Sequence, residues 1–380
     1  MVSSKQMEAI FKTAERSHAK VILIGDTQQL KAVEAGKPFA QLQANGMETA
    51  GMSEIQRQKN PELKQAVQLA ATGKVVESLS LLEKSVIEIK SAEDRQNSIA
   101  KEYALLSEEE RKKTLVVSGT NEARRSINQK IRENLGLTTR KTFPALEEKS
   151  FTKAQLKELS TYKVGDTIQA ERSYQSMGLK KGDLAQVQEI KQSYLILQKP
   201  DGSVTKWEPQ KKNKVSVYQQ TNKEIATGEV IRFTRNDPQK QFHNGDRGKV
   251  LKIDEDRNIY LQKEDGKIFK LDGTKPLHLE YGYCSTVHAA QGKTCDRVLI
   301  EADTKSLTSA QDNYYVAISR ARHEVKIYTN DKEKLPEAMN RKSEKESALE
   351  VKVPVIDKTP TQARQADREK RSGQEMELHI

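Results

Sequence analysis

The sequence contains no long apolar run. Its longest strongly apolar stretches are four or five residues, such as VILI at 21–24. A helix that crosses a membrane needs about 20 such residues. The start, MVSSKQMEAI, also has no apolar signal core. The composition, with 31% charged residues among 380, therefore predicts a soluble cytoplasmic protein without a membrane partner, large enough for roughly two to four domains.

Cysteine is scarce as well. The sequence has two, Cys284 and Cys295, together with six scattered histidines. A structural zinc site takes four Cys or His ligands at characteristic spacing, and the sequence has no such set. Two reduced thiols are the ordinary state in the cytoplasm, so no metal site is predicted.

The sequence also lacks a phosphate-binding P-loop, although it contains Gly292-Lys293-Thr294. The full pattern G-x-x-x-x-G-K-[ST] requires an earlier glycine, because two glycines let backbone N–H groups surround the phosphates. The chain has the β-branched Val287 at that position. No other segment matches, so the tripeptide needs another explanation.

Positive charge is present in excess, with 65 basic and 54 acidic residues and a net charge of +11. Such an excess favours polyanionic partners, of which nucleic acid is the commonest. A lysine-rich solvated surface would give the same count. Charge alone therefore leaves both interpretations open.

The two ends of the chain show α/β patterns. Apolar periodicity predicts helices at 8–18, 61–84, 121–136 and 309–322, and strands at 21–25, 85–89, 114–119, 297–302 and 325–329. Asn121 is the expected cap of the third helix, and Gly136 its end. Gly25-Asp26 follows the first strand, which is fully apolar and thus predicted to be buried on both faces. Chemistry gathers at the carboxyl ends of such strands.

The middle of the chain carries a repeat. From about Thr161 to residue 280, short alternating runs are separated by Gly-Asp and Asp-Gly turns, as in small all-β domains. Gly182-Asp183 recurs as Gly245-Asp246, and the order of strands and turns is the same in both halves. The pattern predicts two tandem SH3-like barrels inserted into the α/β domain. Three aromatic residues in this region are candidates for base stacking or, more simply, for barrel core: Trp207, Tyr174 and Phe233.

Four short stretches stand out around this insertion. They are GDTQQL at 25–30, EIQRQ at 54–58, STVHAAQGKT at 285–294 and YVAISRAR at 315–322. Each has an ordinary explanation by itself: a strand and turn, a solvated Arg57, a core His288, a surface ion pair of Arg320. Their order and combination are much more specific.

In this order the stretches resemble motifs III, IV, V and VI of superfamily 1 DNA helicases of the RecD-like branch. The chain is most similar to the C-terminal part of the helicase module of TraI-type conjugative relaxases. The resemblance implies a RecA-like second lobe with a parallel sheet and a role in 5′-to-3′ unwinding that uses ATP and Mg²⁺. It assigns Gly292-Lys293-Thr294 to motif V. The implied domains are a remnant of the first lobe (1–50), the first half of the second lobe (51–150), the barrels (151–283), the second half of that lobe (284–332) and a charged, disordered tail (333–380).

The resemblance also implies roles for single residues. Arg57 and Arg320 would be arginine fingers on the γ-phosphate, and Gln29 would sense that phosphate. Asp26, Gln291 and Gly292 would lie at the nucleotide. Contacts with the backbone of single-stranded DNA fall to the following residues: Thr286, His288, Thr120 and Asn121.

One departure from the family matters. The P-loop lysine and the Walker-B Asp-Glu, which normally precede motif III, are absent from the sequence. The expectation is therefore an N-terminally truncated helicase, inactive alone, whose ATP site is completed by an upstream helicase or relaxase polypeptide. An ATP-independent DNA-binding remnant and a scaffolding fragment are the alternatives.

Overall fold

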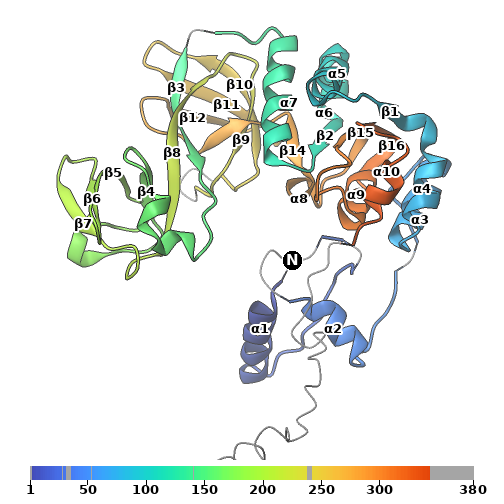
Figure 1. Cartoon of the computed structure of the whole chain (residues 1–380), viewed down its shortest axis with the longest axis horizontal. Helices are drawn as coiled ribbons and strands as arrows, with labels where there is room; N and C mark the ends of the chain where they lie inside the picture. Colours follow the sequence, from blue (N-terminus) through green and yellow to red (C-terminus); the bar gives the residue numbers. More distant parts are fainter. Residues whose placement is uncertain are drawn as a thin grey trace, which may run out of the picture. The chain divides into compact units, whose positions relative to one another are not determined.

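The computed structural model describes residues 2–27, 29–30, 36–52, 54–139, 141–237 and 242–342 (Figure 1). Two compact units make up the chain. The smaller consists of residues 1–27, 31–50 and 344–380, and the larger of residues 28–30 and 51–343. Among the described helices, none combines the length and the apolarity that crossing a membrane requires.

The smaller unit contains two helices, α1 (Ser4–Arg16) and α2 (Pro38–Ala44). A capping box of Ser3 and Gln6 starts α1. The strand predicted at 21–25 is wrong: the segment has no regular secondary structure, and Ile22 and Ile24 are 76% and 88% exposed. A strand apolar on both faces needs neighbouring strands, and the described residues of this unit form none.

A five-stranded parallel sheet organises the larger unit. Its strands are β1 (Val86–Glu88), β2 (Thr114–Ser118), β14 (Cys284–Thr286), β15 (Cys295–Ala302) and β16 (Ala321–Thr329), in the order β1-β16-β15-β2-β14. All four neighbouring pairs are parallel. The α/β class with a parallel sheet is thus confirmed.

Helices cover both faces of this sheet, because successive strand residues point to opposite sides. Leu115 and Val117 of β2 join one core, whereas Val116 between them joins the other. The first core includes residues of α3 (Pro61–Ala71), α4 (Val75–Leu81), α8 (Val287–Ala290), α9 (Gln311–Ile318) and α10 (Leu335–Met339). The second includes residues of α5 (Ala92–Leu105) and α7 (Asn121–Asn134). The remaining helices are α6 (Glu108–Lys112) and four short 3₁₀ turns, Glu83–Ser85, Gln155–Lys157, Leu159–Thr161 and Gln175–Met177.

Two helix boundaries differ from the prediction. The helix expected at 61–84 is two helices, α3 and α4, separated by Gly73 at a φ of 82°. The cap of α7 is Thr120, whose hydroxyl accepts from the backbone N–H of Ala123, whereas Asn121 is already helical. A threonine in extended conformation satisfies this end as well as asparagine would.

Two antiparallel sheets lie between β2 and β14 in the sequence. The first copy of the repeat consists of β4 (Thr167–Ala170), β5 (Leu184–Ile190), β6 (Leu195–Gln198), β7 (Val204–Trp207) and β8 (Val215–Glu224). The second copy consists of β9 (Val230–Phe233), β10 (Arg247–Ile253), β11 (Asn258–Lys263), β12 (Ile268–Asp272) and β13 (Leu279–Tyr281). Their strand orders correspond, β8-β4-β5-β6-β7 and β13-β9-β10-β11-β12.

The correspondence extends to single hydrogen bonds. Gly182 N donates to Ala170 O in the first copy, and Gly245 N donates to Phe233 O in the second, both at 2.8 Å. A register shift follows Val187 in β5, and another follows Val250, its counterpart in β10. The three candidate stacking residues, Trp207, Tyr174 and Phe233, are at most 6% exposed, so they are core.

The strand β3 (Thr142–Glu148) belongs to neither copy alone. It pairs with β8 along its whole length, and Leu146 N donates to Leu277 O ahead of β13. The antiparallel structure therefore begins at Thr142, whereas the sequence predicted the boundary between the α/β part and the barrels after residue 150. Residues 343–380 of the predicted disordered tail lie outside the described residues, whereas Leu335 and Met339 of α10 are buried.

Candidate functional site

Arg57 and Arg320, which are far apart in the sequence, meet at Ser319. The Nη1 of Arg57 donates to Ser319 O at 2.7 Å, and the Nη2 of Arg320 donates to Ser319 Oγ at 2.8 Å. Gln58 reinforces this contact through its Nε2, which lies 2.8 Å from Ala321 O. The C-terminal end of α9, at Ser319, thus binds both guanidinium groups.

The two arginines differ in exposure. Arg57 is partly exposed, whereas Arg320 is only 2% exposed. Arg320 Nε donates to Val316 O at 3.0 Å, and its Nη1 lies 3.5 Å from Lys293 O. Backbone carbonyls of α9 and of the 291–294 loop therefore hold the Arg320 guanidinium within the protein.

The same loop contacts the segment predicted to be motif III. Gln291 Nε2 donates to Gln29 Oε1 at 3.1 Å. Gly292 has a φ of 86°, a conformation in which a side chain would be strained. Gln29, Gln291, Gly292 and the two arginines are thus brought into one region of the larger unit. Asp26 belongs to the smaller unit.

The residues predicted to contact DNA lie where β2 and β14 end. Thr120 and Thr286 are the N-caps of α7 and α8, and each hydroxyl accepts a backbone N–H three residues on. Because β2 and β14 are neighbouring parallel strands, these two threonines share one edge of the sheet. Asn121 and His288, one and two residues beyond these caps, are exposed.

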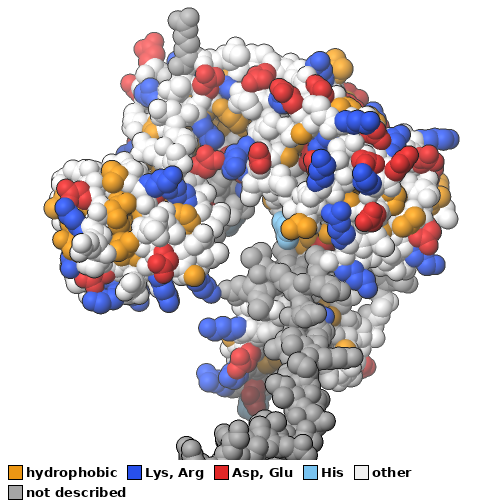
Figure 2. Space-filling view, in the orientation of Figure 1, with side chains coloured by type: hydrophobic (Ala, Val, Ile, Leu, Met, Phe, Trp, Pro, Cys, Tyr) orange, Lys and Arg blue, Asp and Glu red, His pale blue; other side chains and the backbone are white. Residues whose placement is uncertain are grey.

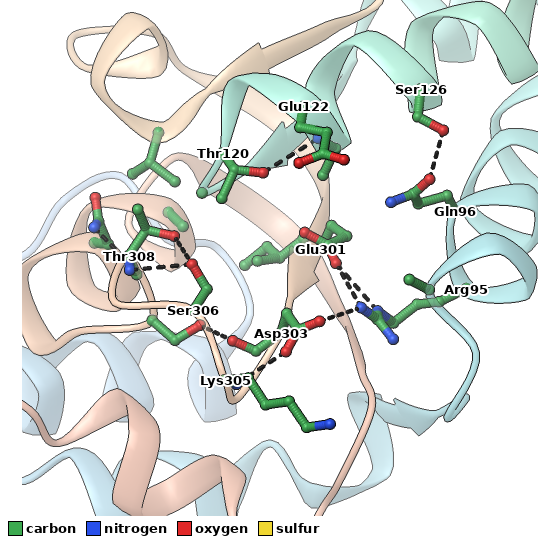
Figure 3. A pocket seen from close by; sticks show the side chains of 18 of the residues that line it. Arg95, Gln96, Thr120, Glu122, Ser126, Glu301, Asp303, Lys305, Ser306 and Thr308 are labelled. Carbon is green, nitrogen blue, oxygen red and sulfur yellow. Dashed lines mark hydrogen bonds and ion pairs between the residues drawn. The ribbon is translucent and has the colours of Figure 1, made fainter.

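A cavity of about 560 Å³ opens near Thr120, between α5, α7 and the loop after β15 (Figure 3). Arg95, which is 1% exposed, donates there to Glu301 Oε1 and to Asp303 Oδ2, both at 3.0 Å. Burial raises the pKa of Glu301, and Arg95 opposes that shift. Because these charges satisfy one another, they brace the loop instead of presenting a free charge to the cavity.

Sequence reasoning did not anticipate a buried charge cluster between α7 and the second copy. Arg132 Nε lies 2.7 Å from Glu229 Oε2, and Tyr283 Oη donates to Glu229 Oε1 at 2.8 Å. Arg124 and Arg232 share the carboxylate of Glu280. The only available signal was the spacing of Arg124, Asn128 and Arg132 on one face of a helix.

The charged surface does not point to one site by itself. On the face shown in Figure 2, basic and acidic side chains are interspersed. Among the described residues, no three His, Cys, Asp or Glu side chains are grouped to hold a metal ion. Both cysteines are free thiols, and burial raises the pKa of Cys295 to about 11, which leaves it unreactive.

Two family models match the chain. One is described as an AAA domain and matches residues 1–91. The other is described as the viral superfamily 1 RNA helicase core domain and matches residues 179–329.

Curated relatives include conjugation proteins and a helicase. The multifunctional conjugation protein TraI of Escherichia coli K12 is 25% identical over 414 residues, which cover 94% of this chain and 23% of TraI. The probable conjugal transfer protein TraA of Sinorhizobium fredii is 25% identical over 92% of this chain and 26% of TraA. The ATP-dependent RecD2 DNA helicase of Deinococcus radiodurans is 35% identical over 102 residues, which cover 26% of this chain and 14% of RecD2. The chain spans about a quarter of the length of the TraI and TraA proteins.

Similar solved structures include Pif1 helicases. Pif1 from a study of unwinding at forked double-stranded DNA has a TM-score of 0.42 and 14% identity, and covers 82% of this chain and 60% of its own. Bacteroides Pif1 in complex with ADP-AlF3 and ssDNA has a TM-score of 0.34 and 16% identity, with 85% and 67% covered.

Proposed function

Because the chain is related to the superfamily 1 RecD-like helicases, in the form carried by TraI-type conjugation proteins, we propose that it supplies the second RecA-like lobe of an ATP-dependent DNA helicase in conjugative transfer. Its partners are single-stranded DNA and a first lobe with the P-loop lysine and Walker-B carboxylates. The two copies of the repeat form SH3-like barrels inserted in this lobe.

The observation that supports the proposal is the convergence of four separate segments. Arg57, Arg320, Gln291 and Gln29 come from the four predicted motifs and are joined by hydrogen bonds through Ser319 and between the two glutamines. Unrelated surface residues would have no reason to meet in this way.

In this function the two guanidinium groups donate to γ-phosphate oxygens, since a planar fork bridges phosphate oxygens well. Gln29 and Gln291 link that position to the loop that precedes β15. These arginines and glutamines are suited to the part of an ATP site that supplies positive charge to the phosphates. Mg²⁺ needs carboxylate ligands, and these would come from the first lobe.

Arg320 must move to act as a finger, because its side chain is 2% exposed and held by the carbonyl oxygens of Val316 and Lys293. This burial favours a second candidate function, in which the chain binds DNA without ATP and Arg320 only braces α9 against the 291–294 loop. A scaffolding role without any ligand is the remaining alternative.

The test is ATP turnover in the presence of single-stranded DNA and Mg²⁺. The chain is mixed with a separately expressed first lobe of a TraI-type relative that carries the P-loop. We expect turnover only in the mixture. Arg320→Ala should lower it at least about 100-fold, because arginine fingers contribute about 10³–10⁵ in rate.

Arg322→Ala is the matched control. Arg322 lies two residues further along, is 51% exposed and pairs with Asp296 at 3.6 Å. Its loss should change turnover by less than about twofold. Arg320→Lys retains the charge without the fork, and its melting temperature separates misfolding from a catalytic defect. Equal rates for the Arg320 and Arg322 variants would remove the finger role, and turnover by the chain alone would contradict the need for a first lobe.

A further inference from the structure

Two arginines face each other in the second copy. Arg247 of β10 and Arg232 of β9 are directly opposite in the strand register, and Arg232 is opposite Glu280 of β13. Like charges at opposite positions of a sheet are destabilising. A row of this kind therefore needs a compensating partner.

The carboxylate of Glu280 does not compensate for the whole row. Arg232 Nε lies 2.9 Å from Glu280 Oε1, and Arg124 Nη1 of α7 lies 2.5 Å from Glu280 Oε2. Arg247 instead donates from Nη2 to Ser285 Oγ of β14 at 2.6 Å. Its Nε is buried and has no hydrogen-bond partner among the described residues. Two guanidinium groups thus share one carboxylate, and the third, Arg247, contacts a hydroxyl instead.

The first copy shows that the fold does not require these charges. In the first copy Gln169 lies opposite Leu184 on one side and opposite Ser216 on the other. These three residues occupy the positions of Arg232, Arg247 and Glu280, respectively. The topology, the glycine turn and the register shift are otherwise the same in both copies. The arginines are therefore specific to the copy that packs against α7.

A cavity of about 430 Å³ lies between α7 and the second copy, and Arg124 and Arg232 line it. Its wall also contains Thr234, whose Oγ1 is buried without a hydrogen-bond partner in the described structure. Two further basic residues, Arg125 and Lys223, and three acidic residues, Glu147, Glu148 and Glu280, complete the charges of this wall. Asn121, one of the predicted DNA contacts, stands at the same cavity.

The electrostatics agree with this geometry. Burial lowers the pKa of Arg232, against Glu280, and that of Arg247, against Tyr103 and Glu264. Burial, and after it the charge of Arg247, lowers the pKa of Lys293 to about 8. An anion near this cluster would reverse these shifts, because an opposite charge favours the ionised form of each base.

We propose that the cavity between α7 and the second copy, lined by Arg124 and Arg232, is a phosphate-binding cleft that holds the backbone of single-stranded DNA, and that Arg247, opposite Arg232 in the strand register, adds its positive charge from outside the lining. This inference rests on the proposed function, since it names the DNA surface of that lobe. The unpartnered Thr234 hydroxyl, the guanidinium groups of Arg124 and Arg232 and the neighbouring Asn121 all fit a phosphodiester. Inorganic phosphate has the same chemistry, so the experiment must separate the two sources.

The experiment measures binding of a fluorescent oligothymidylate to the whole chain by anisotropy at several salt concentrations. The variant Arg232→Gln with Arg247→Leu installs the residues of the first copy. We expect affinity to fall about tenfold, and the slope of log K against log salt to fall by at least about 0.7, because Arg232 lines the cleft and each single-strand phosphate contact contributes about 0.7. The control, Lys211→Gln with Lys275→Gln, removes the same charge from side chains that are 76% and 78% exposed. It should leave the slope nearly unchanged.

Each outcome discriminates. Equal slopes for the two double variants overturn the cleft while leaving DNA binding intact, whereas no oligothymidylate binding by the wild-type chain overturns the DNA function itself. A thermal shift with inorganic phosphate, without oligothymidylate binding, assigns the cleft to a free anion and overturns the proposal. Relief of repulsion should let the arginine variant melt no lower than the wild type without DNA. A lower melting temperature, unaffected by DNA, would mean a structural role.

Discussion

The two copies of the five-stranded sheet share one topology but differ in what they contact. In the second copy, Glu229 is fully buried and receives Arg132 from α7 and Tyr283. The corresponding residue of the first copy, Asp166, pairs with Lys149, a partly exposed residue that follows β3. At this duplicated position, Glu229 thus links the second copy to α7, which packs on the parallel sheet. In the first copy, Asp166 instead binds residues near it in the sequence, Lys149 and the backbone N–H of Lys163.

The comparison shows that a repeat can keep its hydrogen bonds while its charges diverge. The glycine turns and register shifts are shared, because they determine the fold. The neutral row of Gln169, Leu184 and Ser216 has become a charged one only where a second surface faces it. Function is therefore to be sought in the differences between the copies.

The largest expected effect tests the anchoring of the second copy. Arg132→Met leaves Glu229 fully buried without its cation and with only the Tyr283 hydroxyl as a side-chain donor, which should cost about 3–5 kcal/mol. Lys149→Met should cost about 1–2 kcal/mol, because the backbone N–H of Lys163 still donates to Asp166. Amide hydrogen exchange of β9 and of β4 measures each copy. Arg132→Met with Glu229→Leu should recover most of the loss, and equal costs for the two single variants would contradict the asymmetry.

An intermediate effect depends on pH. Burial, and then Arg235, lowers the pKa of His278 to about 4, although Asp237 and Glu171 oppose this. The folded chain thus binds a proton less readily than the unfolded chain, whose histidine titrates near 6.5. The contribution of His278 to the free energy of unfolding is therefore constant above about pH 6.5 and decreases as the pH falls towards 4. At pH 5 the free energy of unfolding is lower than at neutral pH by about 2 kcal/mol.

The variant His278→Gln isolates this group, which packs against Tyr218 of the first copy. Denaturation at pH 7 and pH 5 should show a smaller loss in the variant than in the wild type. The corresponding residue of the first copy is Lys214, so the first copy has no histidine at this position. An identical loss in both proteins would assign the acid sensitivity to other groups.

The smallest effect concerns the shared turn. Gly182 and Gly245 have φ values of 94° and 96°, and no heavy atom lies within 4 Å of the site of an added Cβ. Alanine at either position should cost about 1–2 kcal/mol, from backbone strain alone. Urea denaturation of the two variants should give equal losses. Unequal losses would mean that the copies are less alike than their hydrogen bonds indicate.

Much of the architecture was predictable. Four of the five strands of the parallel sheet, all except β14, follow from periodicity, as the inserted repeat and its two glycine turns follow from turn residues. The helicase relatives confirm the family inferred from the motifs. The 21–25 segment failed as a strand, because apolar periodicity describes what a segment could bury and says nothing about whether partner strands are present. Gly73 was missed because its effect depends on a positive φ.

The sequence predicted which residues of the candidate site belong together, but not how deeply each of them is buried. The order of the motifs suggested that Arg57, Arg320, Gln29 and Gln291 belong together, and their roles remain predictions. The burial of Arg320 could not be foreseen, since arginine is usually solvated. The same expectation hid Arg132, Arg232 and Arg247, which look like surface charges until the register of distant strands places them.

The strand β3 has a consequence for anyone who wishes to transplant one of the copies. Its Phe143 is part of the hydrophobic cluster of the second copy, while its backbone pairs with β8 of the first. A gene fragment cut at Glu224 would keep β3 with the first copy and remove Phe143 from the core of the second. Moving β3 to the second copy would instead expose the edge of β8. The two copies are separate in the sequence, but in the structure they share one strand and cannot be divided without loss.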